Sequence, residues 1–307
     1  MKVETRGLWL GLLGVILFSV TLPATKLATG PADAPQLSPV FVTFGRAAVA
    51  GVLSLLYLML TRGPRPRGRQ WAGLGFTACG VVVGFPLFMA LGLRHVESIH
   101  ASVVLGILPL ATAVVASLWL RQRPSVGFWV CAVAGSALVG AFVLLRSNAG
   151  NTSAQWADLL LLLAVLSAAF GYVGGGQLTS TLGAERVICW VLVLSLPLTV
   201  PVTVFSRPPE PVLTSAWLGF AYVALISMWI GFFAWYRGLA LGGTVRVSQV
   251  QLVQPFLTML FSVPLLGESL DAITVGFAIA VIATVFIGKR MPVSSVAVPA
   301  YTQRTAT

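Results

Sequence analysis

Uncharged polar side chains inside apolar stretches are the residues of this sequence best suited to chemistry. Within 244–266, one helical face at 3–4 spacing carries Ser248, Gln251, Pro255, Thr258 and Ser262. Gln254 flanks this face. Such neutral donors and acceptors can hydrogen-bond a zwitterionic molecule without trapping it. The alternative is hydrogen bonding between helices, which contributes only about 0.6–2 kcal/mol per bond in a membrane.

A related but less polar face occurs within 97–120. It carries Ser102, Leu105, Pro109 and Thr112. A shift of 146 residues carries Ser102 onto Ser248 and Pro109 onto Pro255. We therefore expect a site whose two sides differ in chemistry. Because proline removes a backbone hydrogen bond and bends a helix, Pro109 and Pro255 are candidate hinges, with static kinks as the alternative.

Two side chains that can carry charge lie within or at the start of apolar segments. Arg46 lies about two turns into 38–61, where it could pair with a substrate carboxylate or cap carbonyl groups of a neighbouring helix. His100 begins its segment and could titrate near neutral pH, or it could form an interfacial hydrogen bond. Among the aromatic residues, Tyr172 and Trp235 could line an apolar pocket wall, although most aromatic side chains should face lipid or core.

Several kinds of catalytic site are missing from the sequence. It contains no Gly-rich phosphate-binding run of the G-x-x-x-x-G-K-[ST] type, and its eight acidic residues fall in loops or near the ends of apolar segments. No His/Cys/Glu spacing indicates a metal site, and the three cysteines lie in apolar segments as expected for packing residues. We therefore expect neither an enzyme, a cofactor nor a bound metal.

The elements that must position these residues are membrane helices. Charged residues make up 9% of the chain and hydrophobic residues 57%, whereas a soluble domain has about 25% charged residues. Segments long and apolar enough to span a bilayer are 8–28, 38–61, 71–93, 97–120, 125–145, 157–176, 184–205, 213–236, 244–266 and 271–288. The sequence predicts an all-α integral membrane protein with ten transmembrane helices. A retained first segment is preferred over a signal peptide.

The same shift of 146 residues reveals an internal repeat. It superimposes rare residue types, among them Trp71 on Trp217 and Gly92 on Gly238. The predicted halves are 1–146 and 156–290, followed by a tail at 291–307. Because each half has five helices, the second must enter the membrane in the opposite orientation. Internal repeats of this kind are typical of secondary transporters, with the substrate site between the halves near the bilayer midplane.

The positive charges predict the orientation. With the N-terminus in the cytoplasm, fourteen Lys and Arg residues fall inside and four outside, and Arg46 lies within a helix. This is the positive-inside bias, so both termini should be cytoplasmic. The bias also accounts for the net charge of +11 without a nucleic-acid partner.

Local sequence features add a family resemblance. They are Phe18-Ser19 with Pro23-Ala24-Thr25-Lys26, Phe44-Gly45-Arg46, and Gly267-Glu268. With the ten-helix pattern, the chain over about 7–290 resembles the EamA-type branch of the drug/metabolite transporter superfamily, and within it YddG-type amino-acid exporters. The resemblance implies a cavity lined by the first, third, fourth, sixth, eighth and ninth helices, and export of amino acids or related metabolites.

The preferred function is therefore a secondary transporter that exports amino acids across the inner membrane by alternating access. An exporter of other metabolites or amphiphilic drugs, and a membrane scaffold or receptor subunit, are the alternatives. The expected partners are a small-molecule substrate and the lipid bilayer, with a monomer as the expected working unit. The expected substrate-binding residues are Gln251, Ser248, Gln254, His100, Ser102, Tyr172, Trp235 and Arg46.

Overall fold

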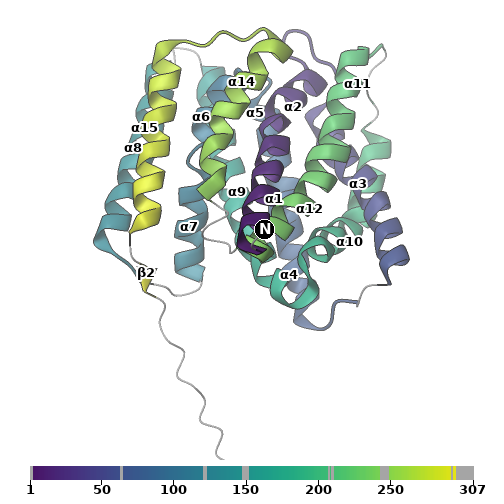
Figure 1. Ribbon diagram of the computed structural model, residues 1–307. Helices are drawn as coiled ribbons and strands as arrows, with labels where there is room; N and C mark the ends of the chain where they lie inside the picture. Colours follow the sequence, from purple (N-terminus) through teal and green to yellow (C-terminus); the bar gives the residue numbers. More distant parts are fainter. Residues whose placement is uncertain are drawn as a thin grey trace, which may run out of the picture.

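The computed structural model describes residues 3–62, 65–119, 123–146, 152–206, 208, 211–242, 249–291 and 293–294. These residues form a bundle of helices (Figure 1). Two short strands, β1 (Arg123–Pro124) and β2 (Val293–Ser294), pair antiparallel at the lower end of the bundle in that view. The predicted all-α class is confirmed, apart from these two strands of two residues each.

The helices of the first half follow one another along the chain. They are α1 (Val3–Ser19), α2 (Thr21–Thr29), α3 (Pro39–Thr61), α4 (Arg69–Ala78), the π-helical η1 (Cys79–Gly84), α5 (Phe85–Gly92), α6 (Ser98–Leu105), α7 (Leu108–Trp119) and α8 (Val126–Arg146). Local signals set their ends. Ser38 caps α3 by accepting a hydrogen bond from the Phe41 amide at 3.0 Å, with Pro39 as the first helical residue.

The helices of the second half have a similar pattern. They are α9 (Thr152–Leu182), α10 (Ala184–Phe205), α11 (Thr214–Ala221), the π-helical η2 (Tyr222–Ile230), α12 (Gly231–Gly242), the 3₁₀-helical η3 (Gln249–Val253), α14 (Gln254–Leu266) and α15 (Ala272–Arg290). Gly267 ends α14 in the left-handed conformation, with φ of 68°, which glycine adopts without a steric cost.

Within the described residues, seven helical stretches of 22–25 residues are long and apolar enough to cross a membrane. They occupy the first four and the sixth to eighth of the predicted segments. The other three predicted segments hold α8, the η3–α14 pair and α15. The described chain thus has the helix content of a multi-pass membrane protein.

Two of the membrane segments are interrupted near their middle. The α6 helix ends at Leu105 and α7 begins at Leu108, so Pro109 is the second residue of α7. The 3₁₀ turn η3 precedes α14, in which Pro255 is likewise the second residue. Proline is tolerated in a first helical turn because its missing N–H is not needed there. The predicted bends at Pro109 and Pro255 are thus breaks that directly precede each proline.

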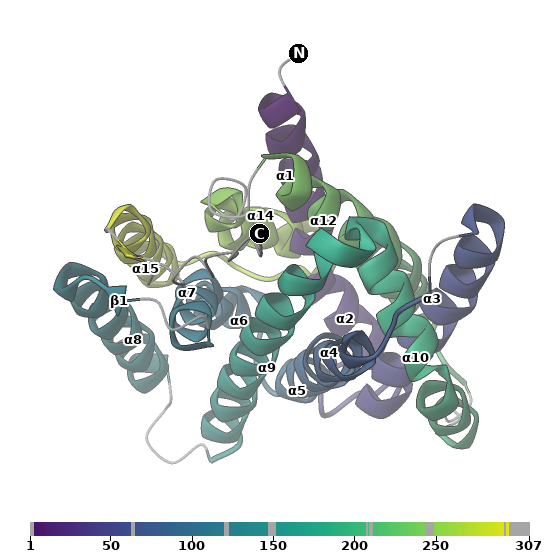
Figure 2. The same ribbon diagram turned by 90° about the horizontal axis from the view of Figure 1, so that it is seen from below.

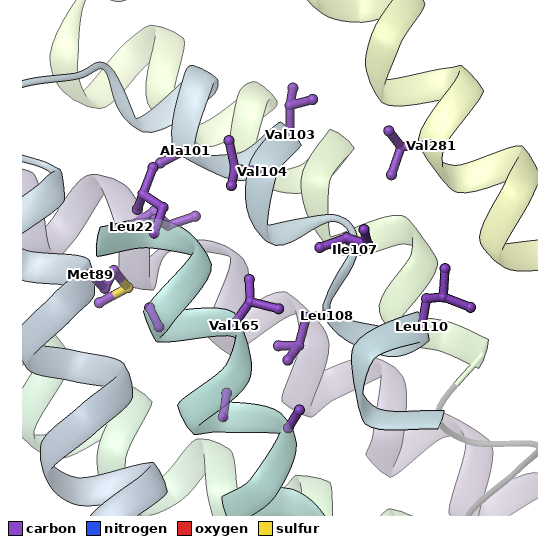
Figure 3. Close-up of a cluster of buried hydrophobic side chains, with 14 of the residues drawn as sticks. Leu22, Met89, Ala101, Val103, Val104, Ile107, Leu108, Leu110, Val165 and Val281 are labelled. Atoms are coloured by element: carbon purple, nitrogen blue, oxygen red, sulfur yellow. The ribbon is translucent and has the colours of Figure 1, made fainter. Parts of the chain in front are cut away.

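The helices pack in long pairs. In the view from below, α8 and α15 lie together at one edge and α3 and α10 at the other (Figure 2). Close approach depends on small residues: a Cβ on Gly80 would lie 2.5 Å from the Ser167 carbonyl oxygen, so η1 can contact α9 only with glycine there. An apolar core surrounds the break between α6 and α7, where Ile107 and Leu108 lie near Val165 and Leu22 (Figure 3).

Connections at the upper end of Figure 1 are joined to one another. The Ala32 amide donates to the Arg94 carbonyl at 3.0 Å, and the Leu213 amide donates to the Gln36 side chain at 2.9 Å. We call this end, which also holds the connection 267–271, the upper end. The end that holds β1 and β2 is the lower end.

Candidate functional site

A cavity lies where the two broken segments meet. It is lined by Phe18, Thr21, Leu22, Arg46, Val81, Phe85, Met89, Ser102, Leu105, Gly106, Leu108, Pro109, Tyr172, Ser227, Phe232, Gln251, Gln254, Pro255 and Thr258. These residues come from both halves of the chain. The breaks before Leu108 and Gln254 both open onto this cavity, so the helix ends and the polar face predicted within 244–266 share one site.

The hydroxyl groups of the lining are hydrogen-bonded. Thr21 and Ser227 lie 2.8 Å apart, from Oγ1 to Oγ, and thereby join α2 to η2. The Thr258 hydroxyl donates to the Ser19 carbonyl at 3.0 Å, and the Ser102 hydroxyl donates to the Ile99 carbonyl at 2.7 Å. The polar face was expected either to bind substrate or to form hydrogen bonds between helices. The bonds of these hydroxyls agree with the second alternative.

The two amides of the lining differ from the hydroxyls. Gln251 is 7% exposed and Gln254 is half-buried, and within the described part of the chain their side chains have no hydrogen-bond partner. A buried amide left without a partner costs free energy. Gln251 and Gln254 are therefore the uncharged groups of the cavity with hydrogen-bonding capacity left for a bound molecule.

Arg46 is the cation of this site. It is 2% exposed, and its Nη2 lies 3.2 Å from the Met228 sulfur. Its Nε and Nη1 are buried without a hydrogen-bond partner in the described residues. Tyr172, which also lines the cavity, is close enough to interact with the guanidinium electrostatically. Arg46, Ser102, Tyr172, Gln251 and Gln254, five of the residues expected to bind substrate, thus line one cavity.

Aromatic rings form the apolar wall of the cavity. Phe18 and Phe232 meet edge to face with centroids 5.1 Å apart, and Tyr172 meets Phe232 at 6.5 Å. Trp235 was expected in this wall but is not among the lining residues. It lies behind Phe18 at 6.4 Å and faces Gly14 of α1, so its role in this structure is packing.

The space inside is narrow. A water molecule can enter a volume of about 50 Å³, which holds only a few waters. The described side chains therefore leave little free space in this cavity.

His100 lies near the start of its helix, as expected, but it is not among the residues that line the central cavity. It lines a second cavity of about 340 Å³ at the upper end with His95, Glu97 and Asp271. Its Nε2 is 2.6 Å from Asp158 Oδ1, and its ring packs against Phe142 at 4.9 Å. His100 is the third residue of α6 and lies in its first turn, next to the connections of the upper end. Ser248, another predicted binding residue, lies outside the described residues.

A polar network that sequence reasoning missed closes the upper end. Glu268 has a side chain only 5% exposed, and its Oε1 lies 3.1 Å from Lys26 Nζ. The carboxylate also accepts hydrogen bonds from the Ser98 and Ile99 amides at 2.8 and 2.9 Å, and from the Ser98 hydroxyl at 2.8 Å. Glu268 thus caps the start of α6, where the helix dipole favours an anion. Lys26 and Glu268 carry opposite charges, and both stand in the stretches on which the family resemblance rests. This was the sequence signal from which their contact could have been predicted.

The network continues toward the central cavity. The Ser98 and Ser262 hydroxyl oxygens lie 2.8 Å apart, and the Ser262 hydroxyl donates to the Thr258 carbonyl at 2.7 Å. Ser98 and Ser262 are both fully buried. We call Lys26, Glu268, Ser98 and Ser262 the upper seam. It joins α2 and α6 of the first half to α14 of the second.

Comparisons with known proteins agree with a membrane transporter. The EamA-like transporter family matches residues 5–146 and 155–288. The chain is 43% identical over 292 residues to the uncharacterized transporter YdeK of Bacillus subtilis, covering 94% of this chain and 99% of that protein. It is also 25% identical over 304 residues to a probable terminal-alkyne amino-acid exporter of Streptantibioticus cattleyicolor, covering 94% and 95% of the two chains.

The fold has a counterpart among solved structures. One crystal structure superimposes with a TM-score of 0.64 over 92% of this chain and 96% of that chain, at 16% sequence identity. At this identity the likeness concerns the fold alone.

Proposed function

Because the chain belongs to the EamA-like transporter family, we propose that it is a secondary transporter that exports amino acids or related small metabolites across the inner membrane. The observation that carries the proposal is the central cavity: Arg46, which has two nitrogens without a partner in the described residues, lines it together with the amides of Gln251 and Gln254. Broken helices that present polar groups at mid-membrane are typical of transporter substrate sites.

Helix boundaries support two inverted five-helix repeats. The helices α5, α7 and α8 begin at Phe85, Leu108 and Val126, and α12, α14 and α15 begin at Gly231, Gln254 and Ala272. Each pair is 146 residues apart, the shift that superimposes the two halves of the sequence. The π-helical segments η1 and η2 also overlap under this shift, since 79–84 becomes 225–230. The two segments matched by the family, 5–146 and 155–288, coincide with the proposed halves.

The upper end is proposed to face outward. The cytoplasmic bias of Lys and Arg places both termini inside, which puts the upper seam on the external side of the cavity. In this structure, the seam joins the first and second parts of the chain on that side. Export then requires the seam to part, so that the cavity alternates between the two sides of the membrane.

The cavity favours a small zwitterion with an apolar side chain. The neutral amides and hydroxyls can hydrogen-bond a polar head group, and the ring wall of Phe18, Phe232 and Tyr172 can contact an apolar part. The name of one relative, a probable terminal-alkyne amino-acid exporter, agrees with this chemistry. A transport role, without enzymatic turnover or cofactor, accounts for this arrangement.

Flux through reconstituted liposomes tests the proposal. Purified protein is incorporated into vesicles, and uptake of a panel of labelled amino acids, amines and amphiphilic cations is measured with and without a pH gradient. Saturable uptake of at least one amino acid above that of protein-free vesicles is expected. Uptake of the amphiphilic cations alone would favour a drug exporter, and no uptake of any compound would favour a scaffold.

A further inference from the structure

We propose that Arg46 is the carboxylate-binding residue of the central cavity, so that the transported molecules are those that carry a carboxylate. The inference rests on the proposed transport function and names its substrate class. Arg46 lies on α3, seven residues after Pro39 and therefore roughly 10 Å along the helix from its first residue. The guanidinium is thus placed well inside the apolar span and lines the cavity.

The charge of Arg46 has no acidic partner among the residues that the structure describes. Among the described lining residues there is no aspartate or glutamate. Two other basic residues of the described chain do have acidic partners: Lys26 pairs with Glu268 at 3.1 Å and Arg237 with Glu185 at 2.7 Å. A buried unpaired charge inside a membrane protein is costly and usually faces a functional cavity or a partner. The missing partner of Arg46 is therefore an anion that enters the cavity.

A purely structural role for Arg46 would require other contacts. Arginine that stabilises helix ends does so by donating to backbone carbonyl groups, but no such bond reaches Arg46 in the described residues. Its one hydrogen-bond contact is the Met228 thioether, which is a weak acceptor. Two of its three nitrogens are left without any acceptor. The Arg46 side chain is therefore buried, but most of its N–H groups have no hydrogen-bond acceptor among the described residues.

The chemistry of the cavity selects a carboxylate among possible anions. A guanidinium binds carboxylate and phosphate groups through its fork of N–H donors. A phosphate carries a second negative charge, and the described lining offers no second cation for it. A carboxylate carries a single negative charge, which the single guanidinium of Arg46 can match. The Gln251 amide oxygen then remains as an uncharged hydrogen-bond acceptor for the ammonium of an amino acid.

The test compares each amino acid with the amine that lacks its carboxylate. Phenylalanine and phenethylamine form such a pair, and other amino acids transported in the panel are paired in the same way. Wild-type protein should take up the amino acid on the order of tenfold faster than the amine. The Arg46→Met variant should raise the half-saturating amino-acid concentration on the order of tenfold and abolish the preference. Arg46→Lys, which keeps the charge but loses the fork, should lie between them.

The control variant is Arg237→Met, which removes an exposed arginine that pairs with Glu185 away from the cavity. It should keep the preference and the half-saturating concentration. An Arg46→Met or Arg46→Lys protein that still discriminates like the parent would overturn the proposal.

Binding without transport separates this inference from the proposed function. Phenylalanine and 3-phenylpropionate, which keep the carboxylate, should raise the unfolding temperature of solubilised wild-type protein, whereas phenethylamine should not. Phenylalanine and 3-phenylpropionate should each raise the unfolding temperature of the Arg46→Lys variant less than that of the wild-type protein. Carboxylate binding without flux would contradict only the transport function, and equal shifts by the amine would contradict only the role of Arg46.

Discussion

Lys26 Nζ lies 3.1 Å from Glu268 Oε1, and this pair joins α2 to the connection between α14 and α15. The same carboxylate accepts the Ser98 and Ile99 amides at the start of α6. A single side chain of the second half therefore holds two helices of the first half. Since the seam is buried, its parting would expose groups that need new partners. In the proposed transport cycle, we expect the strength of the seam to set how readily the upper end opens.

The first prediction concerns the coupling within this pair. Lys26→Met leaves a buried carboxylate without its cation, and Glu268→Met leaves the Ser98 and Ile99 amides without an acceptor. In a double-mutant cycle with these two variants, the coupling energy should be about 1–3 kcal/mol. Unfolding free energies of the four proteins in detergent supply the cycle.

The matched control for this cycle is the Arg237–Glu185 pair at the lower end. Its arginine side chain is 54% exposed, against 17% for Lys26, so its coupling should be about 0–1 kcal/mol. A Lys26–Glu268 coupling no larger than that of the control pair would show that the seam does not hold the upper end.

The second prediction separates the hinge from the binding residue. Pro255→Ala restores an N–H that can donate to the Gln251 carbonyl and thus continue α14 through the 3₁₀ turn. The variant should lower the maximal transport rate more than substrate affinity, because a straight helix favours one end state. Gln251→Ala should mainly raise the half-saturating concentration. Initial rates over a concentration series, at equal protein content, distinguish the two effects.

Pro264→Ala is the control for the hinge, because Pro264 lies within the same helix but is exposed and away from the cavity. It should transport like the parent. If Pro255→Ala also does so, the break before α14 is a static kink. If Gln251→Ala leaves the concentration dependence unchanged, Gln251 does not bind substrate.

The third prediction concerns the driving force. The buried carboxylates Asp158 and Glu268 both lie at the upper end, and each has a basic partner, His100 and Lys26. We therefore expect downhill export, with at most a weak proton linkage through His100. Accumulation of labelled amino acid in liposomes under an imposed proton gradient is the measurement. Strong accumulation that persists in His100→Ala would contradict this expectation.

The fourth prediction is the topology. A reporter that is active only in the cytoplasm, fused after Asn151, should be inactive, whereas the same reporter fused at the C-terminus should be active. The reason is the excess of Lys and Arg in the loops assigned to the inside. The reverse pattern of activities would contradict this orientation and would mean that the upper seam faces the cytoplasm.

The sequence predicted the helices and most of the cavity, because hydrophobic length and the 3–4 spacing of polar residues are local properties. Gln251, Pro255 and Thr258 were placed on one face, and they line one cavity. Trp235 could not be placed in the same way. An aromatic residue on a helix can face a cavity or a neighbouring helix, and only the position of α1 decides that it packs behind Phe18.

Contacts between distant segments were beyond the reach of periodicity. Lys26 and Glu268 are separated by 242 residues, and each by itself looks like a solvated residue at a membrane boundary. His100 was likewise assigned to substrate binding because its partner, Asp158, is 58 residues away in another helix. Such pairs depend on helix packing, which no single segment encodes.

Alternating access through the upper end is the central claim, and a reversible cross-link tests it most directly. The Ser98 and Ser262 hydroxyls are 2.8 Å apart across the two halves, so Ser98→Cys with Ser262→Cys should form a disulfide on oxidation. Cys79, Cys131 and Cys189 are first replaced by alanine. Amino-acid flux in liposomes should fall to that of protein-free vesicles on oxidation and return on reduction. Unchanged flux with the disulfide formed would contradict the account.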